Sequence, residues 1–312
     1  MRRNLFVHPE RRVRLLAAVV LAIPIVSLSI APQLRAQEAV EAGEQQEGDQ
    51  SRESKALDST ASQWSLQFAY QANTDYRQDT LASGEVRPEG NKGFFQFRMV
   101  APVPIKGGAA RGGVTILPRL TLRYTENKNG QWALSPTDVF ALIVPLEWAT
   151  GRAGIGPDIV IPGSSKVGSS EWAYGLAAAV IQRFFNEKVI AGLLFQQTWG
   201  RRDVVDLSQP VPIPTDQRET GANPLVINPF VTVQLGSGWY LSTNDMAMQY
   251  SWEFKGWMFP VGLRFGYVLV QPKNSWNFYV EYATEFATDD WPGAAAKNKF
   301  RANVSYTIPV GG

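Results

Sequence analysis

Few side chains in this sequence are of the types that carry catalysis. The 312 residues include no cysteine, and the one histidine is His8, close to the N-terminus. Such a chain has no thiolate nucleophile, no histidine base for a serine hydrolase away from its N-terminus, and few of the usual zinc ligands. Sequence patterns that cradle nucleotide phosphates are also missing. We therefore expect no enzyme, no cofactor and no metal site.

Two acidic pairs remain as candidates for acid–base chemistry, Asp289 with Asp290 and Glu281 with Glu285. The first pair is typical of a turn. The second pair belongs to an alternating segment whose neighbours carry basic residues, and ion pairs across adjacent strands account for such charges without catalysis. We expect four residues to form ion pairs that brace a sheet wall: Arg264, Glu281, Glu285 and Arg301.

Three arginines have no such acidic neighbours. Arg98, Arg119 and Arg123 fall on the polar face of two consecutive alternating segments, and these segments carry no acidic residue on that face. Like charges on neighbouring strands repel each other unless an anion or water lies between them. These arginines and Gln96 are therefore the candidates for contact with a solute. Loop carboxylates or lipopolysaccharide phosphates are the alternative partners.

The N-terminal part of the chain predicts export. Five arginines precede an apolar run at 15–31, and this layout, ending at Ala36, is typical of a secretory signal peptide. An uncleaved inner-membrane anchor is the alternative, and both export the remainder. Six of the 30 basic and one of the 28 acidic residues lie in 1–36, leaving 24 and 27. This balance does not suggest a nucleic-acid partner. Residues 37–62, rich in Glu, Gln and Ser, predict a disordered acidic periplasmic tether.

From residue 63 onward, apolar and polar residues alternate with a period of two, which predicts β-strands with one apolar and one polar face. Most of the segments approach the length of about ten residues that crosses a bilayer at a tilt. Twelve strands are expected, at 64–73, 93–103, 114–125, 138–147, 155–162, 172–183, 189–199, 224–235, 239–252, 257–271, 276–286 and 299–309.

The connections between these segments are alternately long and short, except that 253–256 is short on the long side. Tryptophans, among them Trp64, Trp148 and Trp239, stand near strand ends, as they do at membrane–water interfaces. The sequence therefore predicts an all-β protein whose residues 63–312 form a transmembrane antiparallel up-and-down β-barrel of about 12 strands. A soluble periplasmic β-sandwich or barrel is the alternative, because period two alone does not distinguish them.

Several short stretches resemble one bacterial family. Asn228-Pro229-Phe230, then 238–242 (GWYLS), then 259–262 (FPVG) and Gly266 are similar, in order and spacing, to the outer-membrane family labelled "MetA-pathway of phenol degradation". The similarity is best over 223–270 and weaker over 138–199. It implies a membrane β-barrel and passage of aromatic or other small hydrophobic compounds. The end of the chain, Val310-Gly311-Gly312, departs from the usual aromatic C-terminus of outer-membrane barrels.

We therefore expect an outer-membrane channel or transporter for small solutes, with a basic patch in its lumen. Because 12 strands enclose a narrow interior, a specific channel is favoured over a general porin. A structural or adhesive barrel without transport is the alternative. The expected partners are outer-membrane lipids, lipopolysaccharide and an unidentified solute; the oligomeric state stays open. The 24-residue loop at 200–223 is expected to face the cell exterior.

Overall fold

The computed structural model describes residues 52–58, 63–76, 92–106, 112–127, 129–167, 172–200, 225–243, 245, 247–252, 255–289 and 296–309. The expected signal peptide, residues 37–51 and 59–62 of the expected tether, and residues 201–223 of the loop expected at 200–223 lie outside these ranges.

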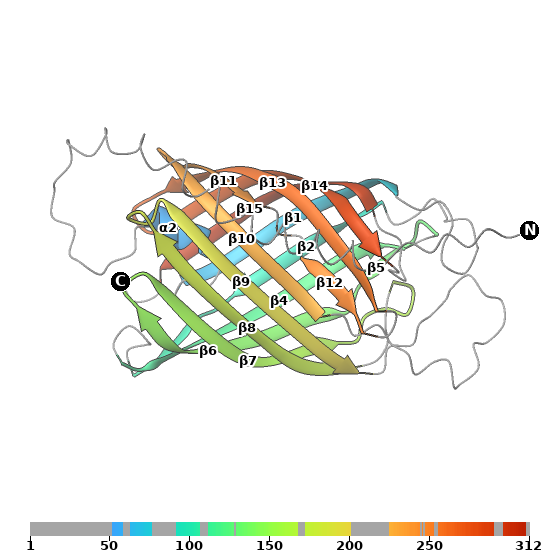
Figure 1. The fold of residues 1–312 in the computed structure, drawn as a ribbon, viewed down its shortest axis with the longest axis horizontal. Helices are drawn as coiled ribbons and strands as arrows, with labels where there is room; N and C mark the ends of the chain where they lie inside the picture. Colours follow the sequence, from blue (N-terminus) through green and yellow to red (C-terminus); the bar gives the residue numbers. More distant parts are fainter. Residues whose placement is uncertain are drawn as a thin grey trace, which may run out of the picture. The chain divides into compact units, whose positions relative to one another are not determined.

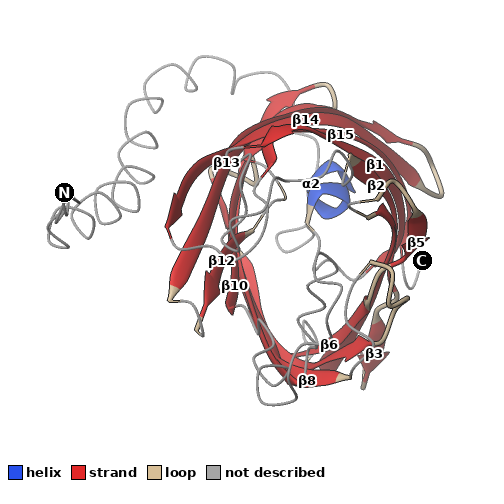
Figure 2. Ribbon diagram, turned by 90° about the vertical axis from the view of Figure 1, so that its right-hand side faces the viewer, coloured by secondary structure: helices blue, strands red, loops and turns tan. Residues whose placement is uncertain are grey.

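Fifteen strand elements form one antiparallel sheet that closes on itself, because β15 pairs with β1 along thirteen positions (Figures 1 and 2). The strands are β1 (Gln63–Tyr76), β2 (Gly93–Val100), β3 (Val103–Ile105), β4 (Val114–Glu126), β5 (Trp132–Leu134), β6 (Thr137–Trp148), β7 (Gly151–Ile161), β8 (Ala173–Phe184), β9 (Val189–Gly200), β10 (Leu225–Gly236), β11 (Trp239–Thr243), β12 (Met248–Ser251), β13 (Gly256–Val270), β14 (Ser275–Asp289) and β15 (Ala296–Pro309).

The fifteen elements make twelve barrel strands. Three pairs of elements each act as one strand. β2 and β3 pair with one edge of β4, and β5 and β6 pair with its other edge. β11 and β12 both lie between β10 and β13. Each of the twelve predicted strands therefore has a counterpart, and the predicted barrel is confirmed. The bounds differ by a few residues; β7, for example, begins at Gly151 instead of 155. The predicted strand at 239–252 is interrupted between Thr243 and Met248.

The apolar faces of the strands point outward. Along β14, inward side chains such as Asn277, Glu281 and Glu285 are buried, while Val280 on the opposite face is 61% exposed. Aromatic side chains are also exposed on the outer surface. Neighbours such as Tyr70 and Phe95 pack against each other there, with their ring centres 4.8 Å apart. A soluble barrel would bury these side chains and expose the polar ones, so the outer surface is of the kind that lipid covers.

Five connections lie at the end of the barrel where β1 begins, and most of them are short turns. Two of them contain only two residues, and one of these is Ser237-Gly238 between β10 and β11, where Gly238 takes a φ of 84°. A side chain at Gly238 would also meet the carbonyl of Val268. Residues 271–274 make another short turn, between β13 and β14. We call this end the short-turn mouth and the opposite end the long-loop mouth.

A short helix, α2 (Arg52–Leu57), lies inside the ring at the short-turn mouth (Figure 2). Ala56 and Leu57 pack against inward side chains of β11, β13 and β14, and Arg52 donates hydrogen bonds to the carbonyls of Pro272 and Asn274 at 3.2 and 3.0 Å. The prediction of a disordered tether over 37–62 therefore does not hold for 52–58. Composition alone could not reveal this, because the partners of these residues lie far along the chain. Among the described residues, no helix has the length and apolar character needed to cross a bilayer.

Candidate functional site

The three arginines expected in the lumen lie on adjacent strands and point inward. Arg98 is on β2, and Arg119 and Arg123 are on β4. Gln96 stands directly opposite Arg123 in the register, and its side-chain oxygen accepts a hydrogen bond from Arg123 Nε at 3.1 Å. The period-two pattern therefore placed all four side chains on the correct face, since the polar face is the inner one.

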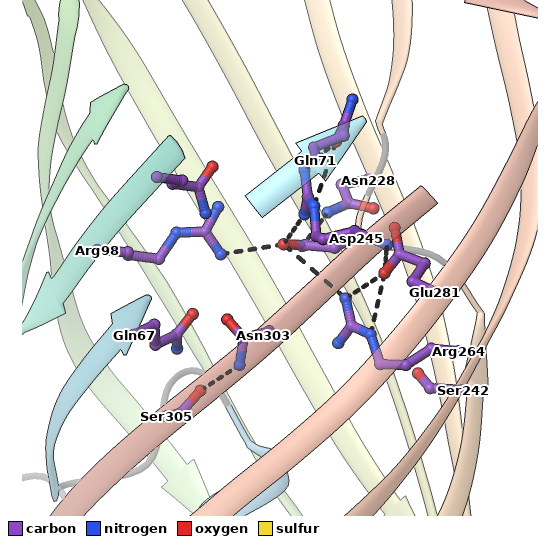
Figure 3. Close-up of polar contacts among 12 residues, drawn as sticks. Gln67, Gln71, Arg98, Asn228, Ser242, Asp245, Arg264, Glu281, Asn303 and Ser305 are labelled. Atoms are coloured by element: carbon purple, nitrogen blue, oxygen red, sulfur yellow. Dashed lines mark hydrogen bonds and ion pairs between the residues drawn. The ribbon is translucent and has the colours of Figure 1, made fainter. Parts of the chain in front are cut away.

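Sequence reasoning missed the acidic partner of Arg98. Asp245 lies in the interruption between β11 and β12, and its Oδ2 is 3.1 Å from Arg98 Nη1 and 3.1 Å from Arg301 Nη1. Arg264 Nη2 is 3.9 Å from the same oxygen. Figure 3 shows Asp245 with Arg98 on one side and Arg264 with Glu281 on the other. A single carboxylate thus joins guanidinium groups from three strands.

This contact crosses the lumen. Twelve strands close the ring. Counted from β12 through β13, β14, β15 and β1, the fifth strand along is β2. Arg98 and Asp245 therefore come from nearly opposite walls. We call Asp245 with Arg98, Arg264 and Arg301 the lumen bridge.

The lumen bridge separates two cavities. The cavity toward the long-loop mouth has a volume of about 570 Å³, and the one toward the short-turn mouth about 90 Å³. Both cavities are lined by the same five residues at their boundary: Arg98, Arg119, Leu194, Asn228 and Asp245. The bridge and its neighbours therefore stand between the two cavities. The smaller cavity is bounded further by Ala56, Leu57 and Asp58 from α2 and the residue after it.

Among the described residues, charged side chains line the larger cavity, which we call the outer cavity. Its lining includes five cationic side chains and three acidic ones, namely Arg98, Arg119, Arg123, Lys299 and Arg301 against Asp138, Asp158 and Asp245. Lys299 is paired with Glu285 at 2.7 Å, so with this carboxylate the described groups are five cationic and four acidic.

Contacts within this lining distribute the charge unevenly. Arg119 is 3.9 Å from Asp138, so their ion pair is loose. Gln196 Nε2 lies 3.3 Å from Asp138 Oδ2 and 3.0 Å from Asp158 Oδ2, and so donates to both carboxylates. Among the described residues Arg123 has no carboxylate within 4 Å, so it carries the clearest uncompensated charge.

The four residues expected to brace the wall have different partners. Arg264 does meet Glu281, with Nη2 2.7 Å from Oε2. Arg301 meets Asp245, and its Nε and Nη2 donate to the side-chain oxygen of Gln71. Glu285 meets Lys299 at 2.7 Å, so each of the four residues takes part in an ion pair, although Arg301 and Glu285 do so with residues outside this set. The reason is the broken strand, which brings Asp245 to Arg301.

Part of the interior is apolar. Leu117, Phe140, Leu142, Val144 and Ala177 form a buried cluster on the inner faces of β4, β6 and β8. The guanidinium of Arg119 lies 4.1 Å above the ring of Phe140, a cation–π contact that holds this arginine at the edge of the cluster. These apolar side chains fill part of the interior beside the lumen bridge. The remaining space lies on the polar side of the barrel.

A second ionic contact holds the helix in the short-turn mouth. Asp58 Oδ2 is 2.9 Å from Arg152 Nη2 on β7 and 3.8 Å from Arg183 Nη1 on β8, and all three side chains are buried. Sequence reasoning did not single out these residues. Within the described ranges, no three acidic or histidine side chains gather as they would around a metal ion.

No family model matches the chain, and no curated protein matches it. Solved structures do resemble it. The COG4313 outer membrane channel from Pseudomonas putida F1 is 12% identical, with a TM-score of 0.51 over 86% of this chain and 99% of that one. Weaker likenesses are the KdgM porin (10% identity, TM-score 0.45, 78% and 98% covered) and the outer membrane phospholipase A of Escherichia coli (12%, 0.40, 78% and 89%). At this identity, the first likeness shows the fold, a closed antiparallel 12-stranded β-barrel of the kind found in an outer-membrane channel.

Proposed function

We propose that this protein is a channel of the bacterial outer membrane that passes small solutes and prefers anions. The observation that carries the proposal is the arrangement of the wall: an apolar outer face, and a polar inner face around a cavity of about 570 Å³ with surplus positive charge. A lumen of one charge sign concentrates ions of the opposite sign and so sets the preference of a pore.

The outer membrane is the location that fits such a barrel. Closed barrels with an apolar belt, short turns at one mouth and long loops at the other are the spanning form of that membrane. The arginine-rich N-terminus with its apolar run supports export of the chain. The named function of the Pseudomonas putida protein, an outer membrane channel, is compatible with this assignment.

The proposed cargo is a small anion that carries an aromatic ring. The ring of Phe94 lines the outer cavity, with the guanidinium groups of Arg123 and Arg301 at 5.6 and 5.7 Å from its centre. An apolar ring face beside cationic groups suits a molecule with one ring and one negative charge. The resemblance to the MetA-pathway family, with its association with aromatic compounds, points to the same class.

Flux through proteoliposomes tests the proposal. The full-length protein is reconstituted, and uptake is compared for benzenesulfonate and benzyltrimethylammonium, two permanently charged ions of similar size that do not cross lipid alone. We expect faster uptake of benzenesulfonate than of the cation, and no uptake in protein-free vesicles. Protein that inserts as a barrel but passes neither ion would favour the structural or adhesive alternative.

A further inference from the structure

We propose that Asp245 occupies the carboxylate site of the solute, and that Arg98 and Arg301 bind the solute's own carboxylate when Asp245 swings away. The physiological use of such a site rests on the proposed channel function. The binding itself does not, and it can be measured without transport.

The geometry of the two arginines is that of an anion site. Their Nη1 atoms converge on one oxygen at 3.1 Å each, although they belong to β2 and β15, which are separated by β1 in the sheet. The side chains are 11% and 5% exposed. Guanidinium groups so deeply buried need a negative partner, since an uncompensated buried charge is strongly destabilising. Whatever replaces Asp245 must therefore also be an anion.

Asp245 stands between the recorded strand pairings of β11 and β12. Thr243 is the last β11 residue paired with β13, and Gln249 is the first β12 residue paired with it. On the other side, β10 pairs with Ser242 and then with Met248. Asp245 has no recorded partner in either ladder, so its displacement breaks no strand pairing. Apart from the arginine contacts, it breaks the hydrogen bond from the Asp245 amide to Glu281 and the one from Asn228 Nδ2 to Asp245 Oδ1. Residues without ladder bonds are the ones that open locally.

Arg98 and Arg264 differ in how far they depend on Asp245. Arg98 Nε is buried without a hydrogen-bond partner in the described structure. Arg264 keeps Glu281 as its partner, with Nε and Nη2 3.0 and 2.7 Å from Oε2, so it does not depend on Asp245 for neutralisation. The exchange therefore concerns Arg98 and Arg301, whereas Arg264 stays in place.

The position of the bridge gives the exchange a consequence for transport. Arg98 and Arg301 both line the outer cavity, so a carboxylate in this cavity reaches them directly. Asp245 lies at the boundary that the two cavities share. A solute carboxylate that takes over the two arginines thus displaces a side chain that stands between the two cavities. The ligand class follows from the site: a small monocarboxylate.

Calorimetric titration of the detergent-purified full-length protein with benzoate tests this, with benzamide as the uncharged probe. When a tethered group competes for a site, the apparent association constant of the ligand equals its intrinsic value multiplied by the fraction of time for which the site is vacant. If Asp245 occupies the site for at least nine-tenths of the time, Asp245→Asn should lower the dissociation constant for benzoate about tenfold or more. Adding Arg98→Gln to that variant should abolish the gain, and benzamide should bind none of the proteins.

Asp138→Asn is the matched control, because it removes one carboxylate from the same cavity and leaves the lumen bridge intact. We expect less than a threefold change there. Equal tightening by both variants, or none by Asp245→Asn, would overturn the proposal. If Asp245→Asn does not form a barrel, Asp245→Ser carries the same expectation.

A second measurement uses the unaltered chain. The amide of Asp245 donates to Glu281 Oε2 at 3.1 Å, and displacement of Asp245 breaks this bond. Benzoate, but not benzamide, should therefore speed hydrogen exchange at Asp245, and unchanged exchange under saturating benzoate would refute the displacement. If Asp245→Asn binds benzoate more tightly but the protein conducts no ions, the channel function alone is refuted. If the protein conducts but Asp245→Asn binds benzoate with the same affinity as the wild type, this site alone is refuted.

Discussion

Removal of the Asp58 carboxylate should release α2 from the short-turn mouth. Asp58 is 3% exposed and lies 2.9 Å from Arg152 and 3.8 Å from Arg183. Breaking a buried ion pair by removing one partner costs about 3–5 kcal/mol. Two other attachments are individually weaker: the partly buried Leu57 contributes less than the roughly 3 kcal/mol of a fully buried leucine, and each hydrogen bond from Arg52 contributes about 1 kcal/mol. Asp58→Asn should therefore lower the ratio of docked to released helix roughly 100- to 3,000-fold.

The chain itself provides the assay. It contains no cysteine, so Ser54→Cys gives a protein with a single thiol on α2 at a position that is fully buried when the helix is docked. A six-residue helix does not persist alone in water, so a released segment exposes this thiol. The rate of maleimide labelling in detergent then reports the released fraction. We expect it to rise at least 100-fold when Asp58→Asn is added, as the lower bound of the ion-pair cost requires.

Glu53→Gln is the control for this experiment, because Glu53 lies on the same helix and has no ion pair among the described residues. It should leave the labelling rate unaltered. A labelling rate in Asp58→Asn within threefold of that in the Ser54→Cys protein would show that the ionic contact does not hold the helix, and that the apolar packing is sufficient.

Three further predictions concern the lumen, the outer face and the orientation. Replacing Arg98, Arg119 and Arg123 together by Gln should move the reversal potential in a salt gradient toward cation preference, most at low ionic strength because salt screens the field; an unmoved potential would leave these arginines a bracing role only. Val280→Arg, on the outer face of β14, should lower the free energy of unfolding in lipid vesicles by about 2–4 kcal/mol, and a loss under 0.5 kcal/mol would speak against lipid at this surface. A thiol from Ser208→Cys, outside the described residues, should react with an impermeant maleimide on intact cells; labelling only after disruption of the outer membrane would invert the orientation.

The barrel could be predicted from sequence because each strand repeats one rule. In the segment that became β14, Phe278 and Val280 alternate with Asn277 and Glu281, and burial follows that alternation residue by residue. The same rule placed Arg98 in the lumen. Local pattern is sufficient for these features because the side chain's face depends only on its neighbours along the strand.

The partners across the lumen could not be predicted in this way. Asp245 belongs to a segment that reads as one strand of 239–252, and its contacts come from strands far along the sequence. The run Thr243-Asn244-Asp245 contains residues that favour turns, and this was the available signal of an interruption. Asp58 gave no such signal, since an acidic residue in a polar tether is ordinarily solvated and only the closed barrel supplies Arg152 and Arg183.

Planar-bilayer recording of the purified wild-type protein in a potassium chloride gradient tests the central claim most directly. A channel with surplus positive charge in its lumen should give discrete conductance steps. The sign of its reversal potential should show that chloride is more permeant than potassium. Protein whose heat-modifiable migration on a gel proves a closed barrel, but which stays silent in the bilayer or prefers potassium, would contradict the account.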